Sequence, residues 1–339
     1  MVFADRTDAQ SLPRVADEAV FVPAEALDGG ANVVVDGARL PGTVLALSHW
    51  PGSGTPEALR ADTSAEIVDR YLALATGGEV VGAITNNHFD EDGLFGIWML
   101  LERPAARSPE RRLAIAAARA GDFGVWSDPS AAQVAIAAMA MADRRSTPFP
   151  EVGRALARAG GRDPAGALYR AILPRTGGLL ADPERYRFLW RDEWERVEAD
   201  IALLDAGAAT LDEEEGADLA VVRAPRALHP MAIHPRTARM RILSVTPDGT
   251  LVLTHRYETW VEYASRDLPR RIDLAPLAAR LDRREAAPGT WLFEGVDAIM
   301  PRLFLAGATG GPAGPAPSSI PAEQLVAELV DLLAGRAAA

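Results

Sequence analysis

A short polar segment between two apolar stretches carries the side chains of this chain that are best suited to chemistry. Residues 86–93 read Asn-Asn-His-Phe-Asp-Glu-Asp-Gly, so one imidazole and three carboxylates, including Glu91, fall within five residues. Alternate residues of an extended segment share a face, which allows His88, Asp90 and Asp92 to converge. Imidazole and carboxylate ligands suit Mn, Mg, Fe or Zn, and a set without cysteine favours the harder metals. The segment therefore predicts a divalent-metal site.

The same segment has an ordinary structural interpretation. Acidic residues are preferred at helix N-termini, and Asp-Gly is a common turn dipeptide. A helix cap at Asp90–Gly93 therefore stays open as the alternative. The intervening histidine and the position after an apolar strand favour the metal site. On that interpretation, replacing Asp90 or Asp92 by alanine abolishes metal binding and leaves the fold broadly intact.

The flanking residues predict the elements that position this segment. Strands are expected at 32–36, 44–48 and 79–85, and helices at 63–76, capped by Asp62 or Thr63, and 94–101. Strands and helices that alternate in short order predict an α/β fold, with a parallel sheet covered by helices. Ligands bind beyond the carboxyl ends of such strands. His49 and His88 each follow a predicted strand, so we expect both at this functional edge.

The rest of the chain predicts two domains after an extended N-terminal arm at residues 1–30. An α/β metal-binding domain at 31–205 precedes a smaller α+β domain at 206–339, which contains a flexible Gly/Pro segment at 307–317. Further helices are expected at 111–120, 131–144, 152–159, 165–172, 183–204 and 320–333. An acidic loop is expected at 212–215, and strands at 219–223, 241–245 and 251–257, the last two joined by a turn at 247–250.

The His-Phe-Asp-Glu-Asp-Gly segment, between an apolar strand and a helix, resembles a metal-binding motif of the DHH phosphoesterase superfamily, His-x-Asp-x-Asp-Gly. The resemblance covers residues 79–101, and the name-giving Asp-His-His triplet does not occur in the chain. It implies a manganese-dependent hydrolase of phosphoesters or phosphoanhydrides, with His88, Asp90 and Asp92 as metal ligands. An aspartate near a later strand belongs to the family pattern, and Asp122 is the candidate for it.

The remaining histidines and several arginines complete the predicted site. His49 is the first choice for an additional ligand, and Asp92 and His49 are the expected catalytic residues. His229 and His234 each precede a proline, which favours extended backbone over a shared helix face. An anionic substrate is expected to meet four residues of the second domain, helped by the neighbouring Arg241. These four are Arg236, Arg239, His255 and Arg256.

Composition excludes several classes of chemistry. The chain has no cysteine, and all 35 of its basic residues are arginine, so thiolate nucleophiles, lysine Schiff bases and a P-loop are absent. The net charge of −12 argues against broad nucleic-acid or membrane binding. No apolar run approaches the roughly 18 residues of a membrane span. We expect a soluble cytoplasmic protein with a small anionic substrate, and the sequence also admits a homodimer.

Three functions remain open at this level. The preferred one is a metal-dependent hydrolase of phosphoesterase type, in which a divalent cation, manganese first, activates a water nucleophile. The second is a non-hydrolytic metal enzyme, such as a lyase or an iron enzyme. The third is a non-enzymatic binding protein in which Asp90–Gly93 is only a helix cap.

Overall fold

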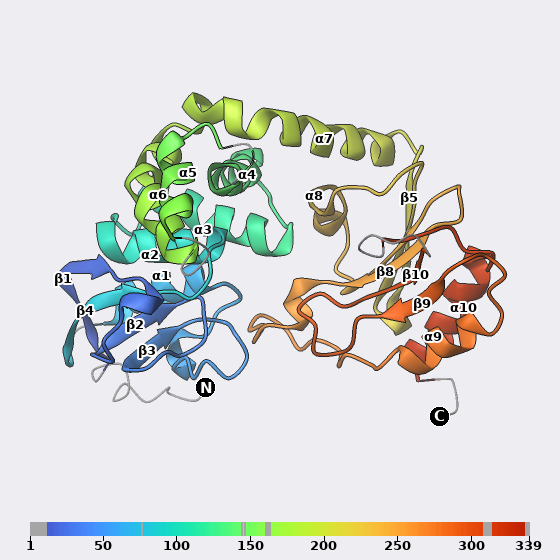
Figure 1. Cartoon of the computed structure of the whole chain (residues 1–339), viewed down its shortest axis with the longest axis horizontal. Helices are drawn as coiled ribbons and strands as arrows, with labels where there is room; N and C mark the ends of the chain where they lie inside the picture. Colours follow the sequence, from blue (N-terminus) through green and yellow to red (C-terminus); the bar gives the residue numbers. More distant parts are fainter. Residues whose placement is uncertain are drawn as a thin grey trace. The chain divides into compact units, whose positions relative to one another are not determined.

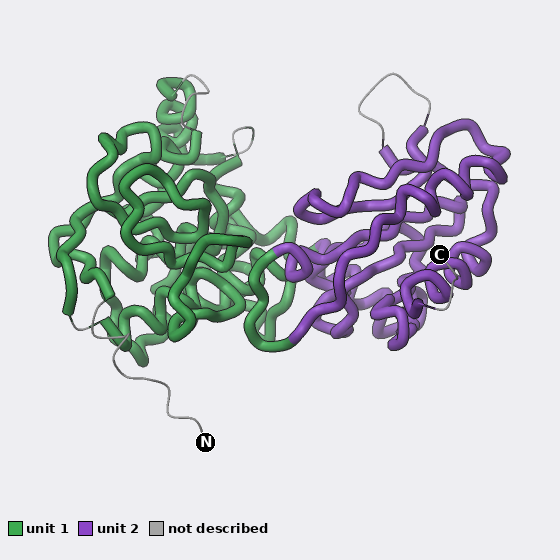
Figure 2. The backbone as a smooth tube through the Cα atoms, turned by 90° about the horizontal axis from the view of Figure 1, so that it is seen from below, with its two compact units in different colours: residues 1–195, 261–266 green, residues 196–260, 267–339 purple. Residues whose placement is uncertain are grey.

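The computed structural model describes residues 12–75, 77–143, 145, 147–159, 164–307 and 314–335. The chain forms two compact units (Figure 2). Unit 1 comprises residues 1–195 and 261–266, and unit 2 comprises residues 196–260 and 267–339. The division follows Glu195, inside a helix, whereas the sequence placed it after residue 205. Unit 1 also includes a short segment from much later in the chain.

Unit 1 contains a four-stranded parallel sheet in the order β1-β4-β2-β3 (Figure 1). Its strands are β1 (Arg14–Phe21), β2 (Asn32–Val35), β3 (Thr43–Leu47) and β4 (Val80–Thr85). The sequence predicted β2, β3 and β4. Strand β1 lies within the predicted N-terminal arm, but it pairs with β4 at the edge of the sheet. Because all four strands are parallel, their C-terminal ends lie along the same side of the sheet, which we call the carboxyl edge.

The helices of unit 1 gather mainly on one side of this sheet (Figure 1). They are α1 (Ser64–Leu74), α2 (Glu91–Glu102), α3 (Pro109–Phe123), α4 (Pro129–Ala142), α5 (Pro150–Ala159), α6 (Pro164–Ala181) and α7 (Arg187–Asp205), the last of which runs into unit 2. Short 3-10 turns occupy Ala24–Ala26, Glu57–Leu59 and Pro183–Tyr186. Helix α1 contacts β3, and α2 contacts β1 and β2. This arrangement confirms the predicted α/β class with a parallel sheet.

Local sequence explains where the two helices beside the sheet begin. Thr63 caps α1 in a capping box, in which its side chain accepts from Glu66 N and Glu66 binds back to the Thr63 N–H. Asp90 caps α2 by accepting from Gly93 N. Helix α2 begins three residues earlier than the sequence predicted, so Asp92 lies in its first turn.

The core of unit 1 forms where α2 packs against the sheet. Val33, Val34 and Val35 of β2 are fully buried, as expected for a central parallel strand. Gly96 lets α2 approach closely, because a Cβ there would lie 2.8 Å from Cγ1 of Val35. This close packing fixes the start of α2, and with it the polar segment, relative to the end of β2.

Unit 2 contains a six-stranded mixed sheet in the order β5-β6-β7-β8-β10-β9. Its strands are β5 (Thr210–Glu214), β6 (Leu219–Arg223), β7 (Arg241–Val245), β8 (Leu251–His255), β9 (Thr290–Phe293) and β10 (Arg302–Ala306). Its helices are α8 (Pro230–Ile233), α9 (Ala275–Asp282) and α10 (Ala322–Leu333), with 3-10 turns at Glu215–Ala217, His234–Arg236 and Tyr257–Thr259. A leucine-rich core gathers β6, β7, β8 and β10 with α9 and α10.

The acidic stretch of unit 2 is a strand and not a loop. The predicted loop at 212–215 is wrong, because most of this stretch belongs to β5, which pairs antiparallel with β6 at the sheet edge. An edge strand tolerates carboxylates, since one face remains in water. In the predicted flexible segment, residues 308–313 lie outside the described residues. The last residues of this segment are held in place, because Pro315 and Pro317 form isolated β-bridges to Ala306 and Thr250, respectively.

Within the described part of the chain, none of the helices is both long enough and apolar enough to span a membrane.

Candidate metal centre

Three consecutive strands of the sheet deliver side chains to the same edge. Asp36 follows β2, His49 follows β3, and His88 follows β4 within the segment that leads to α2. Strand β2 lies between β4 and β3, which places Asp36 between the two histidines. In the sequence, Asp36 stands out only as the last residue of the predicted strand at 32–36. The signal that could have identified it is the same strand-end position that identified His49.

Asp36 has an unusual backbone conformation. Its φ angle is 51°, in the left-handed region that few residues other than glycine adopt. Aspartate tolerates this region better than most residues. Ser64 donates a hydrogen bond of 2.8 Å to Asp36 Oδ1. The chain therefore turns sharply after β2 while the carboxylate stays buried beside the N-terminus of α1.

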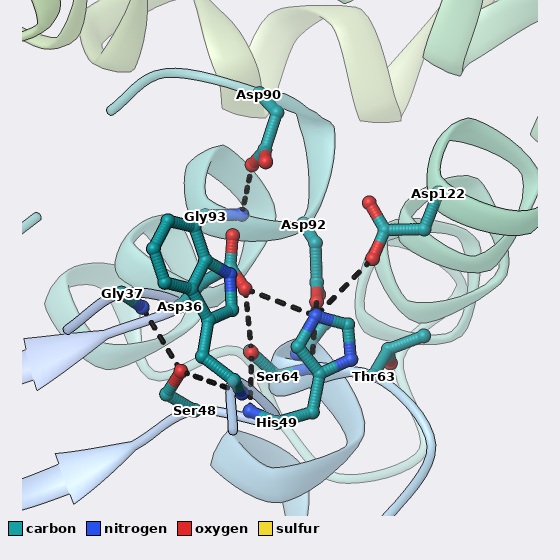
Figure 3. A network of polar contacts seen from close by, with 12 residues as sticks. Asp36, Gly37, Ser48, His49, Thr63, Ser64, Asp90, Asp92, Gly93 and Asp122 are labelled. Carbon is teal, nitrogen blue, oxygen red and sulfur yellow. Dashed lines mark hydrogen bonds and ion pairs between the residues drawn. The ribbon is translucent and has the colours of Figure 1, made fainter. Parts of the chain in front are cut away.

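An inner group of carboxylates surrounds the imidazole of His49 (Figure 3). His49 Nε2 lies 3.3 Å from Asp36 Oδ1, 3.5 Å from Asp122 Oδ2 and 3.7 Å from Asp92 Oδ2. The other ring nitrogen, Nδ1, lies 2.6 Å from the carbonyl oxygen of Asp62. A hydrogen bond from Nδ1 to a carbonyl leaves Nε2 directed at the carboxylates. Ligand atoms of Asp36, His49 and Asp92 all lie within 4.8 Å of one another.

An outer group shares Asp36 with the inner one. His88 Nε2 lies 2.6 Å from Asp90 Oδ2 and 3.3 Å from Asp36 Oδ2. Ligand atoms of Asp36, His88 and Asp90 again lie within 4.8 Å of one another. The two oxygens of Asp36 thus face different histidines. The structure brings together His49, His88, Asp90, Asp92 and Asp122, all five predicted metal ligands, and adds Asp36.

Two of these carboxylates also hold the backbone. Asp92 accepts hydrogen bonds from Ser64 N at 2.6 Å and Ala65 N at 2.7 Å, which satisfies donors at the N-terminus of α1. Asp90 accepts from Gly93 N at 2.9 Å through Oδ1, while its Oδ2 faces His88. The helix-cap interpretation is therefore correct for Asp90, but it does not account for Asp92.

Burial and mutual proximity shift the ionisation of the whole group. Burial alone would lower the pKa of His49 and His88, but hydrogen bonds and charge from Asp36 outweigh it and raise these pKa values to about 9 and about 10. Burial would raise the pKa of Asp36, but its contacts with the two histidines lower it. Burial, followed by the charge of Asp36, raises the pKa of Asp92 to about 8.

The other carboxyl groups are also held away from ionisation. Burial, with the charge of Asp92 next, raises the pKa of Asp122 well above its usual range. Burial and the charge of Asp90 raise the pKa of Glu91 to about 8. Gly121 makes room for Glu91, because a Cβ there would lie 2.7 Å from the Glu91 carboxyl carbon. The cluster therefore holds more acidic groups than its two histidines can neutralise.

These side chains fit divalent cations. Asp36 Oδ2 and Asp122 Oδ2 are buried, and within the described residues each faces a histidine Nε2, at 3.3 Å and 3.5 Å, without a hydrogen bond of good geometry, so both retain acceptor capacity for a cation. Carboxylate oxygens with one imidazole in each group suit Mn²⁺, Mg²⁺, Fe²⁺ or Zn²⁺. Asp36 belongs to both groups, so it would be within reach of a cation held by either one.

The predicted substrate residues lie in unit 2 and have local partners. Arg236 pairs with Asp205, and Arg239 pairs with Glu213. Arg256 is buried in an ion pair with Glu258 and also donates to Thr237 O. These contacts give the predicted role of the three arginines in anion binding no support.

The three other histidines are also in unit 2. His255 is buried against the ring of Phe293, with neither ring nitrogen hydrogen-bonded to a described residue. Its pKa falls to about 3 because burial and then the charges of Arg241 and Arg271 oppose protonation. His229 is extended and caps α8, as its following proline suggests, whereas His234 is helical despite preceding Pro235.

The fold and site together define an α/β protein with a buried histidine–carboxylate cluster at the carboxyl edge of a parallel sheet. The chain belongs to DUF6687, a family of unknown function, whose family model matches residues 17–339. No curated protein and no solved structure matches the chain.

Proposed function

We propose that this protein is a metal-dependent hydrolase of phosphoesterase type that holds two divalent cations, Mn²⁺ first. The observation that carries the proposal is the shared position of Asp36, whose two oxygens each lie 3.3 Å from a different histidine. A carboxylate in this position offers one oxygen to each ligand group. The resemblance of His88–Gly93 to the motif of the DHH phosphoesterase superfamily points to the same chemistry.

Charge balance supports two ions over one. Five carboxyl groups converge with two histidines, namely those of Asp36, Asp90, Glu91, Asp92 and Asp122. Two divalent cations carry four positive charges, which nearly balances the five carboxylates when the histidines are neutral. A single ion would leave a strongly negative site, and such a site repels an anionic substrate.

The two groups differ in access to solvent. The side chains of His49 and Asp92 are 0% exposed, whereas His88 is 28% and Asp90 23% exposed. A substrate can therefore reach the outer group directly. Trp50 lies against His88, with ring centroids 4.7 Å apart, and forms an apolar wall beside this group. His49 and Asp92 have no access to solvent and serve as ligands that fix the inner ion.

The protein's own residues orient the ligands, and the cations supply the reactive chemistry. Bound divalent ions would activate a water nucleophile and neutralise developing negative charge on a phosphoester. The Nδ1 contact to Asp62 O fixes the His49 ring, and the amides of Ser64 and Ala65 fix the Asp92 carboxylate. Ligands fixed in this way need little reorganisation when they bind metal.

Two other functions can be distinguished from a metal-dependent hydrolase by experiment. A lyase or iron enzyme would use the same ligands but would show redox activity or elimination without hydrolysis. A non-enzymatic binding protein would take up no metal at these residues.

The test is metal content followed by a substrate screen. The purified protein is dialysed against Mn²⁺, analysed for bound metal, and assayed on phosphomonoesters and phosphodiesters. We expect about two ions per chain, and we expect Asp36→Asn to lose both the ions and the hydrolysis. Glu18→Ala, an exposed carboxylate on β1, is the matched control and should retain them. Absence of bound Mn²⁺, Mg²⁺, Fe²⁺ and Zn²⁺ in the unmodified protein would overturn the proposal.

A further inference from the structure

The segment 261–266, here called the strap, packs directly behind the metal centre as part of unit 1. Its Glu262 N donates a hydrogen bond of 2.7 Å to the carbonyl oxygen of His49. The Glu262 side chain accepts from Gly52 N at 2.9 Å. The strap therefore holds both ends of the turn from His49 to Gly52, which carries an inner ligand.

Asp62 joins the strap to the same histidine. Its Oδ1 accepts from Ala264 N at 3.0 Å and from Ser265 N at 2.8 Å. Its own carbonyl oxygen lies 2.6 Å from His49 Nδ1. Asp62 is only 4% exposed, so these are interactions shielded from water. One residue thus contacts the strap through its side chain and the His49 ring through its backbone.

Aromatic contacts also connect the strap to the end of α3, which carries the inner carboxylate of Asp122. The ring of Tyr263 packs edge-on against Phe123 at a centroid distance of 5.6 Å, and Phe123 lies 6.2 Å from the His49 ring. Arg119 donates to the Tyr263 hydroxyl at 3.2 Å and to Asp62 Oδ2 at 3.2 Å. Phe123 directly follows Asp122, so the strap also contacts the end of α3 that presents this carboxylate.

We propose that the strap is a positioning element of the inner metal group, fixed in place by Asp62, and that the ion held by His49 depends on it. The inference rests on the proposed function, because it assumes that the inner group binds an ion. The strap is connected on both sides, at Trp260 and Asp267, to residues of unit 2. The inner group therefore requires residues encoded far beyond the first 195, although all its ligands lie among them.

The test compares Asp62→Ala with Asp62→Asn in full-length protein that also carries His88→Ala. The His88 change weakens the outer group, so the remaining bound Mn²⁺ reports the inner one. Asparagine retains an oxygen that accepts from Ala264 N and Ser265 N, and alanine does not. We expect Asp62→Ala to weaken Mn²⁺ binding by about 10- to 100-fold, in the range of lost supporting hydrogen bonds, and Asp62→Asn to retain most of it.

Hydrogen exchange of the 261–266 amides provides a readout that needs no metal. These amides should exchange faster in Asp62→Ala and remain protected in Asp62→Asn. Tyr169→Phe is the control for the outer segment, because its hydroxyl accepts from Asn86, whose Oδ1 in turn accepts from His88 N. In the His88→Ala background it should leave inner Mn²⁺ binding unchanged. Tyr263→Leu serves as a second strap variant should Asp62→Ala fail to fold.

The outcomes separate the two proposals. Faster exchange of the strap with unchanged Mn²⁺ affinity overturns the positioning role, and so does unchanged exchange in Asp62→Ala. If the unmodified protein binds no Mn²⁺, the proposed function fails, and the role of the strap in metal binding fails with it. Hydrogen exchange still shows, in that case, whether Asp62 anchors the strap.

Discussion

Asp36 and His49 follow neighbouring parallel strands, and Oδ1 of Asp36 lies 3.3 Å from Nε2 of His49. The second oxygen of Asp36 lies the same distance from Nε2 of His88. The carboxylate therefore belongs to two ligand groups that are otherwise distinct. Its loss should affect both groups, whereas loss of either histidine should affect one.

The two ions should differ in exchange rate. The inner ligands His49 and Asp92 are 0% exposed, and the outer ligand His88 is 28% exposed, so a chelator reaches the outer ion first. We expect two phases when the Mn²⁺-loaded protein is mixed with excess EDTA, measured with a metal-sensitive dye. His88→Ala should remove the fast phase and leave the slow one. A single phase that persists in His88→Ala would contradict this order.

Bound metal should stabilise the folded protein. A ligand that binds only the folded state adds about 4 kcal/mol when its concentration is 1,000 times its Kd. Thermal unfolding followed by circular dichroism should therefore show a Tm that rises with Mn²⁺ and falls with EDTA. Asp36→Asn should make the Tm insensitive to both. A Tm rise of equal size in Asp36→Asn would place the stabilising ion elsewhere.

Asp92→Ala should destabilise the metal-free protein, contrary to the expectation from sequence that the fold stays intact. The Asp92 carboxylate accepts from the amides of Ser64 and Ala65, and buried donors left without partners cost about 1–3 kcal/mol each. Asp92→Asn retains one acceptor and should lose less stability, although both variants lose the inner ligand. Urea unfolding in EDTA measures the difference, and equal stability of the two variants would refute it.

Gly93→Ala should be destabilising for a reason specific to this site. A Cβ at Gly93 would lie 2.5 Å from Asn86 Nδ2 and would also meet the Tyr169 hydroxyl. Both are buried, so relief requires a shift of the outer segment and costs about 1–3 kcal/mol. Gly153→Ala is the matched control, because outside its own helix turn no atom of the described residues lies within 4 Å of its Cβ in α5, and it should gain up to about 1 kcal/mol. Urea unfolding of both variants measures these changes, and similar effects at the two glycines would contradict the packing argument.

His255 should make the folded state sensitive to mild acid. Its pKa is lowered from 6.5 to about 3 by burial, so the unfolded chain takes up a proton at this residue before the folded one does. The unfolding free energy therefore keeps its full value, as far as His255 is concerned, above pH 6.5 and decreases as the pH falls towards 3. The contribution lost between pH 6.5 and 5 is about 2 kcal/mol.

His255→Phe isolates this contribution, because phenylalanine has a similar size and no proton to gain. The difference in unfolding free energy between the variant and the unmodified protein should change over this pH range, when both are measured by denaturant titration. A difference that stays constant from pH 7 to 4 would show that His255 is not held neutral.

The sequence by itself determined the elements around the site. Alternating β-branched and amphipathic runs predicted β2, β3, β4, α1 and α2, because burial imposes these periodicities locally. The strand-end rule then placed His49 and His88 at one edge, and the parallel sheet confirms it. The sequence missed β1, β5, β9 and β10, of which β1, β5 and β9 are edge strands, which face water and lack a clear apolar pattern.

Tertiary structure decided which residues complete the cluster. The strand order β4-β2-β3 places Asp36 between the histidines, and no local pattern encodes the order of strands in a sheet. The strap reaches His49 from residues more than two hundred positions later, through amides that donate to the His49 carbonyl and to the Asp62 carboxylate, and no local pattern encodes these pairings. The chemistry of the side chains predicted which residue types bind metal. Only the packed chain determined that Asp36 belongs to both ligand groups and that the strap supports His49.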